Sequence, residues 1–194
     1  MKNRGWIIGL GIVALLAFFL VGRYNGLVRT DEAVGGQWAQ VEAAYQRRAD
    51  LIPNLVNTVK GYADFEQETL TQVIEARAKA TQVTVDPTNL TPEAIANFQQ
   101  AQDGLSGALS RLLVTVERYP DLKANQSFLE LQAELTNTEN KIGFERNKFN
   151  DAVQSFNRSV RTFPNNIVAG LFGFSAKGYF EAAAGSEKAP EVKF

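Results

Sequence analysis

The sequence predicts an all-α fold, in which an N-terminal transmembrane helix continues into an antiparallel, up-and-down four-helix bundle with long helices. Three observations lead to this prediction. Residues 5–22 are uncharged and almost entirely apolar, residues 27–62 carry core positions at helical spacing, and two later segments repeat that spacing. The six Pro residues agree with it, because they lie mostly at the edges of the predicted segments.

The apolar stretch 5–22 is long enough to cross the hydrocarbon core of a bilayer, at the short end of the range. Trp6 and Tyr24 lie near its two ends, where interfacial aromatic residues are common. We therefore expect a membrane anchor at residues 1–23. The alternative is a cleaved signal peptide, but no small-x-small cleavage site follows the apolar run.

The charges around the anchor favour opposite orientations. Lys2 and Arg4 favour a cytoplasmic N-terminus with the bundle outside, whereas Arg23 and Arg29 favour the reverse. Charge alone therefore leaves the orientation open.

The first bundle helix follows the anchor directly. Its core positions recur at steps of three and four, which is the pattern of one helical face. Pro53 cannot donate a hydrogen bond to the carbonyl of Ala49, but the spacing passes through it unchanged, so we expect a kink there. The positions on this face, of which all but the charged Asp31 and Arg48 can serve as core, are Leu27, Asp31, Val34, Trp38, Val41, Tyr45, Arg48, Ile52, Leu55, Val59 and Tyr62.

A second, shorter helix is predicted over about residues 65–82, followed by a Thr-rich linker at residues 84–91. The tripeptide 91–93 (Thr-Pro-Glu) combines an N-cap, a first-position proline and a first-turn acid, so the third helix begins there. Pro120 ends it, because proline cannot continue the helical hydrogen bonds.

A capping box of Ser127 and Glu130 predicts the start of the fourth helix, and Pro164 predicts its end. Short connections make neighbouring helices antiparallel. Residues 24–163 are therefore expected to form the bundle.

Charged residues interrupt two of the helical faces. Arg48 lies midway along the first helix and Glu145 midway along the fourth, so antiparallel packing predicts that they meet as a buried or half-buried ion pair. Glu139, on an adjacent face, is the second candidate partner. The alternative is that the long charged side chains extend into water.

The fourth helix returns toward the membrane, so residues 164–180 are expected close to the bilayer. We expect this segment to contact the membrane surface or a neighbouring copy. The alternative is that it caps its own bundle. Residues 181–194 are expected to form a polar tail. The apolar residues of the segment are Ile167, Val168, Leu171, Phe172, Phe174, Tyr179 and Phe180.

The composition argues against several classes of site. The chain has no His and no Cys, which removes the commonest general base, thiol nucleophiles and the Glu-x-x-His motif of di-iron bundles. It has no EF-hand spacing and no glycine-rich phosphate loop. With a net charge of −1, nothing indicates nucleic-acid binding. We expect no enzymatic activity, no metal and no cofactor.

Several motifs resemble the LemA family. The most specific is the run Arg47–Val56 (RRADLIPNLV), supported by Trp38, by residues 117–124 (ERYPDLKA) and by residues 163–165 (FPN). The resemblance covers essentially the whole chain after the anchor. It implies a membrane segment, an antiparallel helical bundle and no established enzymatic activity.

One branch of the LemA family is linked to magnetosome membranes, which points to membrane organisation. Other relatives carry a lipoprotein-type signal, which places the bundle outside the cytoplasm. By resemblance we therefore expect a single-pass protein of the bacterial inner membrane with a periplasmic or extracytoplasmic bundle.

The matched Arg47, Asp50 and Asn54 lie about one helical turn apart near Pro53. One interpretation is that they form a surface that partners recognise. The other is that they tie the first helix to its neighbours and, with Arg48, satisfy the Ala49 carbonyl freed by Pro53. The structural interpretation is the more favoured of the two.

We interpret the chain as a scaffold or interaction module at the membrane, which contacts lipids and assembles with copies of itself. The alternative is an accessory or regulatory subunit of a membrane protease or a cell-envelope enzyme, with a membrane protein as partner. A hydrolase that uses helix-borne Glu is the least favoured interpretation.

Overall fold

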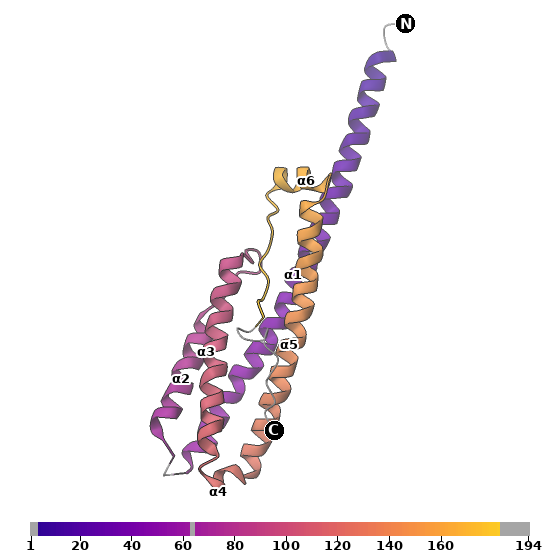
Figure 1. The fold of residues 1–194 in the computed structure, drawn as a ribbon. Coiled ribbons are helices and arrows are strands. Elements are labelled where there is room, and N and C mark those ends of the chain that lie inside the picture. The colour runs from indigo at the N-terminus through magenta and orange to yellow at the C-terminus, as the bar shows by residue number, and fades with distance from the viewer. Residues whose placement is uncertain (1–3, 63–64, 183–194) are drawn as a thin grey trace, which may run out of the picture. The chain divides into compact units, whose positions relative to one another are not determined.

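The computed structural model describes residues 4–62 and 65–182 (Figure 1). Every regular element within these ranges is a helix, which confirms the all-α prediction. The helices are α1 (Arg4–Lys60), α2 (Gln67–Gln82), α3 (Pro92–Val116), α4 (Pro120–Lys123), α5 (Gln126–Arg161) and α6 (Asn165–Phe172). The chain divides into two compact units: unit 1 comprises Met1–Tyr45 and Asn140–Lys177, and unit 2 comprises Gln46–Glu139 and Gly178–Phe194.

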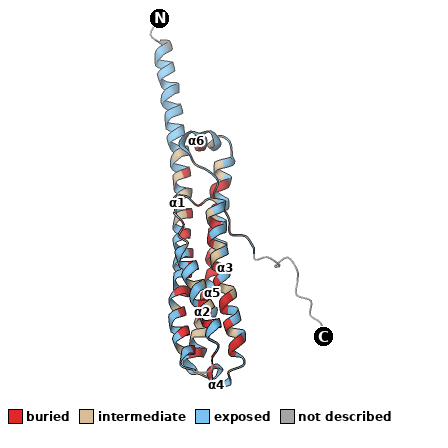
Figure 2. Ribbon diagram, turned by 90° about the vertical axis from the view of Figure 1, so that its left-hand side faces the viewer, coloured by how far each residue is buried: buried red, intermediate tan, exposed pale blue. Residues whose placement is uncertain are grey.

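Helix α1 begins with a segment that is long and apolar enough to cross a membrane. Every large apolar side chain from Trp6 to Val21 is exposed in the fold of the chain itself (Figure 2). Such a long exposed apolar surface is unfavourable in water and matches a lipid-facing span. The segment therefore fits a single-pass membrane protein.

In unit 1, α1 and α5 lie side by side (Figures 1 and 2). The rings of Trp38 and Phe149 meet edge to face between these helices, with their centroids 5.6 Å apart. Helix α6 packs on α1 through Val168 and Ala169, which are buried together with Leu27. Gly173 ends α6 in the left-handed conformation, with φ at 78°, which glycine adopts without strain.

In unit 2, the end of α1 is followed by α2, α3 and the start of α5, and these segments run up and down in turn (Figure 1). The short α4 joins α3 to α5. Thr91 caps α3 as predicted, because its side chain accepts a hydrogen bond from the Ala94 N–H at 3.2 Å. The core includes Ile52, Leu55, Val59, Leu70, Val73, Leu105, Leu112, Phe128 and Leu135.

The predicted capping box at the start of α5 is wrong. The Phe128 N–H donates to Asn125 Oδ1 at 3.0 Å, so Asn125 is the N-cap and α5 begins at Gln126. Ser127 therefore lies inside the first turn, where it cannot cap, and Glu130 accepts a bond from the Gln126 side chain instead. Asn is at least as good an N-cap as Ser, so the earlier residue starts the helix.

Residues 174–182 follow α6 without regular secondary structure. In unit 1, the Asn157 side chain forms two hydrogen bonds with the backbone of Lys177, at 2.9 and 2.8 Å. In unit 2, the Gly178 N–H donates to the Leu90 carbonyl at 2.9 Å. A Cβ at Gly178 would lie 2.6 Å from the Cα of Pro92, so this close approach requires glycine.

Candidate functional site

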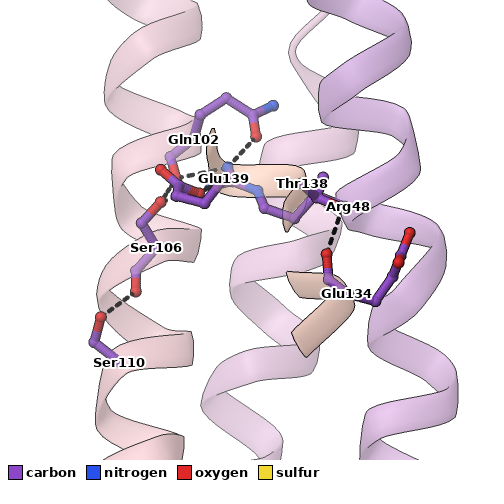
Figure 3. A network of polar contacts seen from close by, with 7 residues as sticks. All are labelled: Arg48, Gln102, Ser106, Ser110, Glu134, Thr138 and Glu139. Atoms are coloured by element: carbon purple, nitrogen blue, oxygen red, sulfur yellow. Dashed lines mark hydrogen bonds and ion pairs between the residues drawn. The ribbon is translucent and has the colours of Figure 1, made fainter. Parts of the chain in front are cut away.

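A buried polar arrangement in unit 2 surrounds Arg48 of α1, which is only 2% exposed. Its Nη1 donates to Ser106 Oγ and to Glu139 Oε2, both at 2.8 Å. Its Nη2 donates to Gln102 Oε1 at 2.9 Å (Figure 3). One side chain thus joins α1 to α3 and α5.

Gln102 extends this arrangement to a further helix. It is 6% exposed, and its Nε2 donates to the carbonyl of Ala80 in α2 at 3.2 Å. Ser106 accepts from Arg48 and donates its own hydroxyl to the Gln102 carbonyl at 3.3 Å. Burying a guanidinium is costly unless its donors find acceptors, and here acceptors from two helices take hydrogen bonds from Nη1 and Nη2. We call Arg48, Gln102, Ser106 and Glu139 the polar layer.

The structure places the two predicted carboxylate partners differently. Glu139 pairs with Arg48 and is 58% exposed, so one edge of the polar layer reaches water. Glu145 belongs to unit 1, where its Oε1 lies 2.6 Å from the Nζ of Lys141. Arg48 and Glu145 are both buried, so neither extends into water as the alternative required. A pairing of Arg48 with Glu145 stays a prediction.

The carbonyl freed by Pro53 has a donor that sequence reasoning missed. Arg77 of α2 donates its Nε–H to the Ala49 carbonyl at 2.8 Å. This bond replaces the helical N–H that proline lacks, so α1 continues through Pro53. The prediction assigned this role to side chains on α1 itself, whereas the donor comes from the neighbouring helix. The spacing within one helix carries no signal for such a partner.

Arg47, Asp50 and Asn54 are exposed on α1. Arg47 Nη2 lies 2.6 Å from Glu134 Oε1 on α5, and Asp50 Oδ1 accepts a bond from Gln46 at 2.8 Å. Arg47 therefore ties α1 to a neighbouring helix, while the other two side chains remain accessible. Whether partners recognise this surface stays a prediction.

The apolar residues of the segment 164–180 separate into two groups. Val168 and Phe180 are buried within the chain, the second with its ring centroid 6.4 Å from that of Phe98. Phe174 is half-buried. These three are thus partly or wholly covered by the chain itself, and a contact with membrane or partner is restricted to the exposed residues. The exposed ones are Ile167, Leu171, Phe172 and Tyr179.

An open groove lies between α2 and α3 in unit 2. Its lining mixes carboxylates, hydroxyls, one guanidinium and the exposed Val114. Within residues 4–62 and 65–182, no group of three or more His, Cys, Asp or Glu side chains could hold a metal ion. The groove is lined by Glu66, Glu68, Thr69, Gln72, Ser110, Arg111, Val114 and Thr115.

Comparison with known proteins identifies the family. A family model described as LemA family matches residues 37–194, which include the polar layer, Pro53 and Arg77. Protein LemA of Metamycoplasma hominis is 29% identical over 171 residues, covering 88% of this chain and 74% of that protein. Magnetosome protein MamQ 2 of Paramagnetospirillum magneticum is 25% identical over 189 residues, covering 89% of this chain and 69% of that protein. Because the family model matches most of its length, the chain belongs to the LemA family.

Proposed function

We propose that this chain is a membrane-anchored, non-enzymatic scaffold that assembles with copies of itself and binds partners beside the membrane. The observation that carries the proposal is the apolar surface of α1 from Trp6 to Val21, which the described chain leaves uncovered. In a bilayer this surface anchors the bundle and is available to a second span.

The charged residues of the interior support a structural role. Arg48 and Arg77 donate to groups of the chain itself, and these bonds hold neighbouring helices together. A guanidinium engaged in this way connects elements and is not free to bind a substrate. The proposed scaffold therefore uses its interior for rigidity and its surface for contacts.

The names of two relatives agree with a role at membranes. Magnetosome protein MamQ 2 and its counterpart MamQ from Magnetospirillum gryphiswaldense, which is 24% identical over 195 residues, are named for a magnetosome. For this chain, we take the likeness as support for a role in membrane organisation.

Two glycines of α1 are the proposed contact between the spans of two copies. Gly5 and Gly9 lie one turn apart, which allows two transmembrane helices to approach closely. Gly11 lies on a different side of the helix. A Cβ at Gly9 or Gly11 meets nothing within 4 Å, so larger residues fit the chain itself at both positions.

Light scattering of the full-length protein in mild detergent tests the proposal. We expect a discrete assembly for the unmodified chain and for the Gly11→Leu control. Gly9→Leu should reduce the mass toward that of one chain, because a leucine holds the helices apart. A single-chain mass for all three proteins would overturn self-assembly.

A second candidate function is an accessory or regulatory subunit of a membrane protease or cell-envelope enzyme. The groove between α2 and α3 favours it, because Val114 is 72% exposed beside Glu68 and Arg111. A membrane protein that co-purifies in stoichiometric amount and is lost with Val114→Glu would support this function. Retention of the partner by that variant would show that the groove does not bind it.

We further propose that the bundle lies on the periplasmic or extracytoplasmic side. The resemblance supports this orientation, as do Lys2 and Arg4, whereas Arg23 and Arg29 favour the reverse. The chain has no Cys, so a single cysteine at the exposed Asp151 can report on it. We expect a membrane-impermeant maleimide to label this cysteine in intact cells. Labelling only after lysis would indicate a bundle on the cytoplasmic side.

A further inference from the structure

We propose that α6 lies in the headgroup region of the same bilayer that holds the span, with its outer face in contact with lipid. The outer face consists of Ile167 and Leu171, and the occupant is a bilayer surface rich in anionic lipid. This inference rests on the membrane anchoring in the proposed function and adds a second membrane contact to it.

The packing within unit 1 places α6 at the end of the span. Its inner residues Val168 and Ala169 are buried together with Leu27 of α1. The ring of Phe172 lies 4.8 Å, between centroids, from the ring of Tyr24. Tyr24 is three residues beyond Val21, which is about 4.5 Å along a helix that rises about 1.5 Å per residue. The contact between α6 and α1 therefore begins less than one helical turn beyond the span.

The outer face of α6 is apolar and largely exposed in the described chain. Ile167 and Leu171 are 52% and 71% exposed, and the preceding Phe163 is 81% exposed. Phe172 packs its ring on Tyr24 and is still 58% exposed. The helix Asn165–Phe172 carries no charged residue. A short helix that is apolar on both faces needs a non-aqueous surface on its outer side.

The charged residues near α6 fit a lipid surface. Arg23 and Arg29 of α1 are exposed, as are Arg158 and Arg161 in the last turns of α5. On the acidic side, Asp31 is paired with Lys177 at 2.8 Å, and Glu32 is exposed. The excess of arginine attracts anionic headgroups, and aromatic rings such as that of Tyr24 favour the same depth.

Continuity with the span favours lipid over a second copy as the occupant. The exposed apolar surface of α1 runs to Val21, and α6, which carries the outer face, contacts the next turn of the same helix through Phe172 and Tyr24. A bilayer that holds the first surface reaches the second without any additional partner.

A fluorescent label tests the depth of α6 in the full chain. Because the chain has no Cys, Leu171→Cys can carry a single nitrobenzoxadiazole group. The labelled protein is reconstituted in vesicles of phosphatidylcholine and phosphatidylglycerol, with or without lipids that carry a doxyl quencher near the headgroup end of the acyl chain. The matched control carries the same label at Asp151→Cys, on the exposed surface of α5 farther from α6.

We expect blue-shifted emission and strong quenching by doxyl lipid at position 171, with little quenching by aqueous iodide. The label at position 151 should show the reverse. Quenching at position 171 by iodide and not by lipid would place α6 in water and overturn the inference. Energy transfer between labelled copies without lipid quenching would assign the face to a second copy and would also overturn it.

Flotation of the same vesicles separates this inference from the proposed function. A protein that floats with the vesicles but carries an unquenched label at position 171 is anchored, so only the placement of α6 fails. A protein that does not float contradicts the anchoring itself.

Discussion

Replacing Arg48 with methionine should destabilise the bundle, because it removes the guanidinium that joins α1, α3 and α5 while keeping most of the apolar stem. The largest loss concerns Gln102, whose Oε1 is buried and would lose its donor. An unsatisfied buried acceptor and a lost charge-assisted hydrogen bond together cost about 2–4 kcal/mol. Glu139 adds little, because it is 58% exposed and regains water.

The neighbouring Arg47 provides a matched control on the same helix. Its ion pair with Glu134 is solvent-exposed, with side-chain exposures of 66% and 36%. Such pairs contribute at most about 1 kcal/mol, so Arg47→Met should have a small effect. The predicted difference between the two Arg→Met variants is therefore on the order of 2 kcal/mol in the free energy of unfolding.

Urea unfolding of the full chain in detergent, followed by far-UV circular dichroism, measures this difference. Adding Gln102→Leu to Arg48→Met removes the unsatisfied side-chain oxygen and should recover part of the loss, reduced by the lost bond from Gln102 Nε2 to the Ala80 carbonyl. Equal stability of the Arg48→Met and Arg47→Met variants would refute a stabilising role for the polar layer.

Three further predictions follow from single contacts. Arg77→Met should lower the free energy of unfolding by about 1–3 kcal/mol in the unmodified chain. Its effect should be much smaller in a chain that already carries Pro53→Ala, because alanine restores a helical N–H to the Ala49 carbonyl. A double-mutant cycle measured by urea unfolding checks this difference. Gly178→Ala should expose the C-terminal segment to limited proteolysis, since its Cβ would approach the Pro92 backbone too closely, and unchanged protection would contradict the packing. Asn125→Ala should lower the free energy of unfolding by about 1 kcal/mol and Ser127→Ala by much less. A larger loss for Ser127→Ala than for Asn125→Ala would instead support Ser127 as the N-cap.

The sequence was sufficient to predict the architecture, because hydrophobic periodicity decides which face of each helix is buried. The buried positions of α1, such as Trp38 and Leu55, follow from this period, whereas the apolar run before Arg23 follows from its length and lack of charge. Thr91 and Pro92 locate the start of α3 because their chemistry acts within one turn. These features depend on residues close together in the chain.

Contacts between distant side chains were harder to predict. Glu139 was named as a candidate for Arg48, but Gln102 and Ser106 were not, because periodicity gives no information on which polar groups of another helix reach a buried arginine. Arg77 was missed for the same reason. A long side chain can satisfy a carbonyl on a neighbouring helix without leaving any pattern in its own.

The C-terminal segment was predicted as one apolar surface, and the structure divides it. Val168 and Phe180 are buried in the chain, whereas Leu171 remains exposed. Composition predicts that such a segment needs cover, but it does not decide whether the chain, a lipid or a partner provides it.

Cysteine cross-linking along the span in native membranes tests the central claim of a self-assembling membrane scaffold most directly. Single cysteines are introduced in turn from Ile7 to Val13, and disulfide-linked dimers are quantified after mild oxidation. If the span self-associates through the two glycines, cross-linking should follow a helical period, with maxima at Gly9, Ile12 and Val13, on the face of Gly5 and Gly9, and a minimum at Ile7. Absence of cross-linking at every position, or equal cross-linking at all of them, would contradict it.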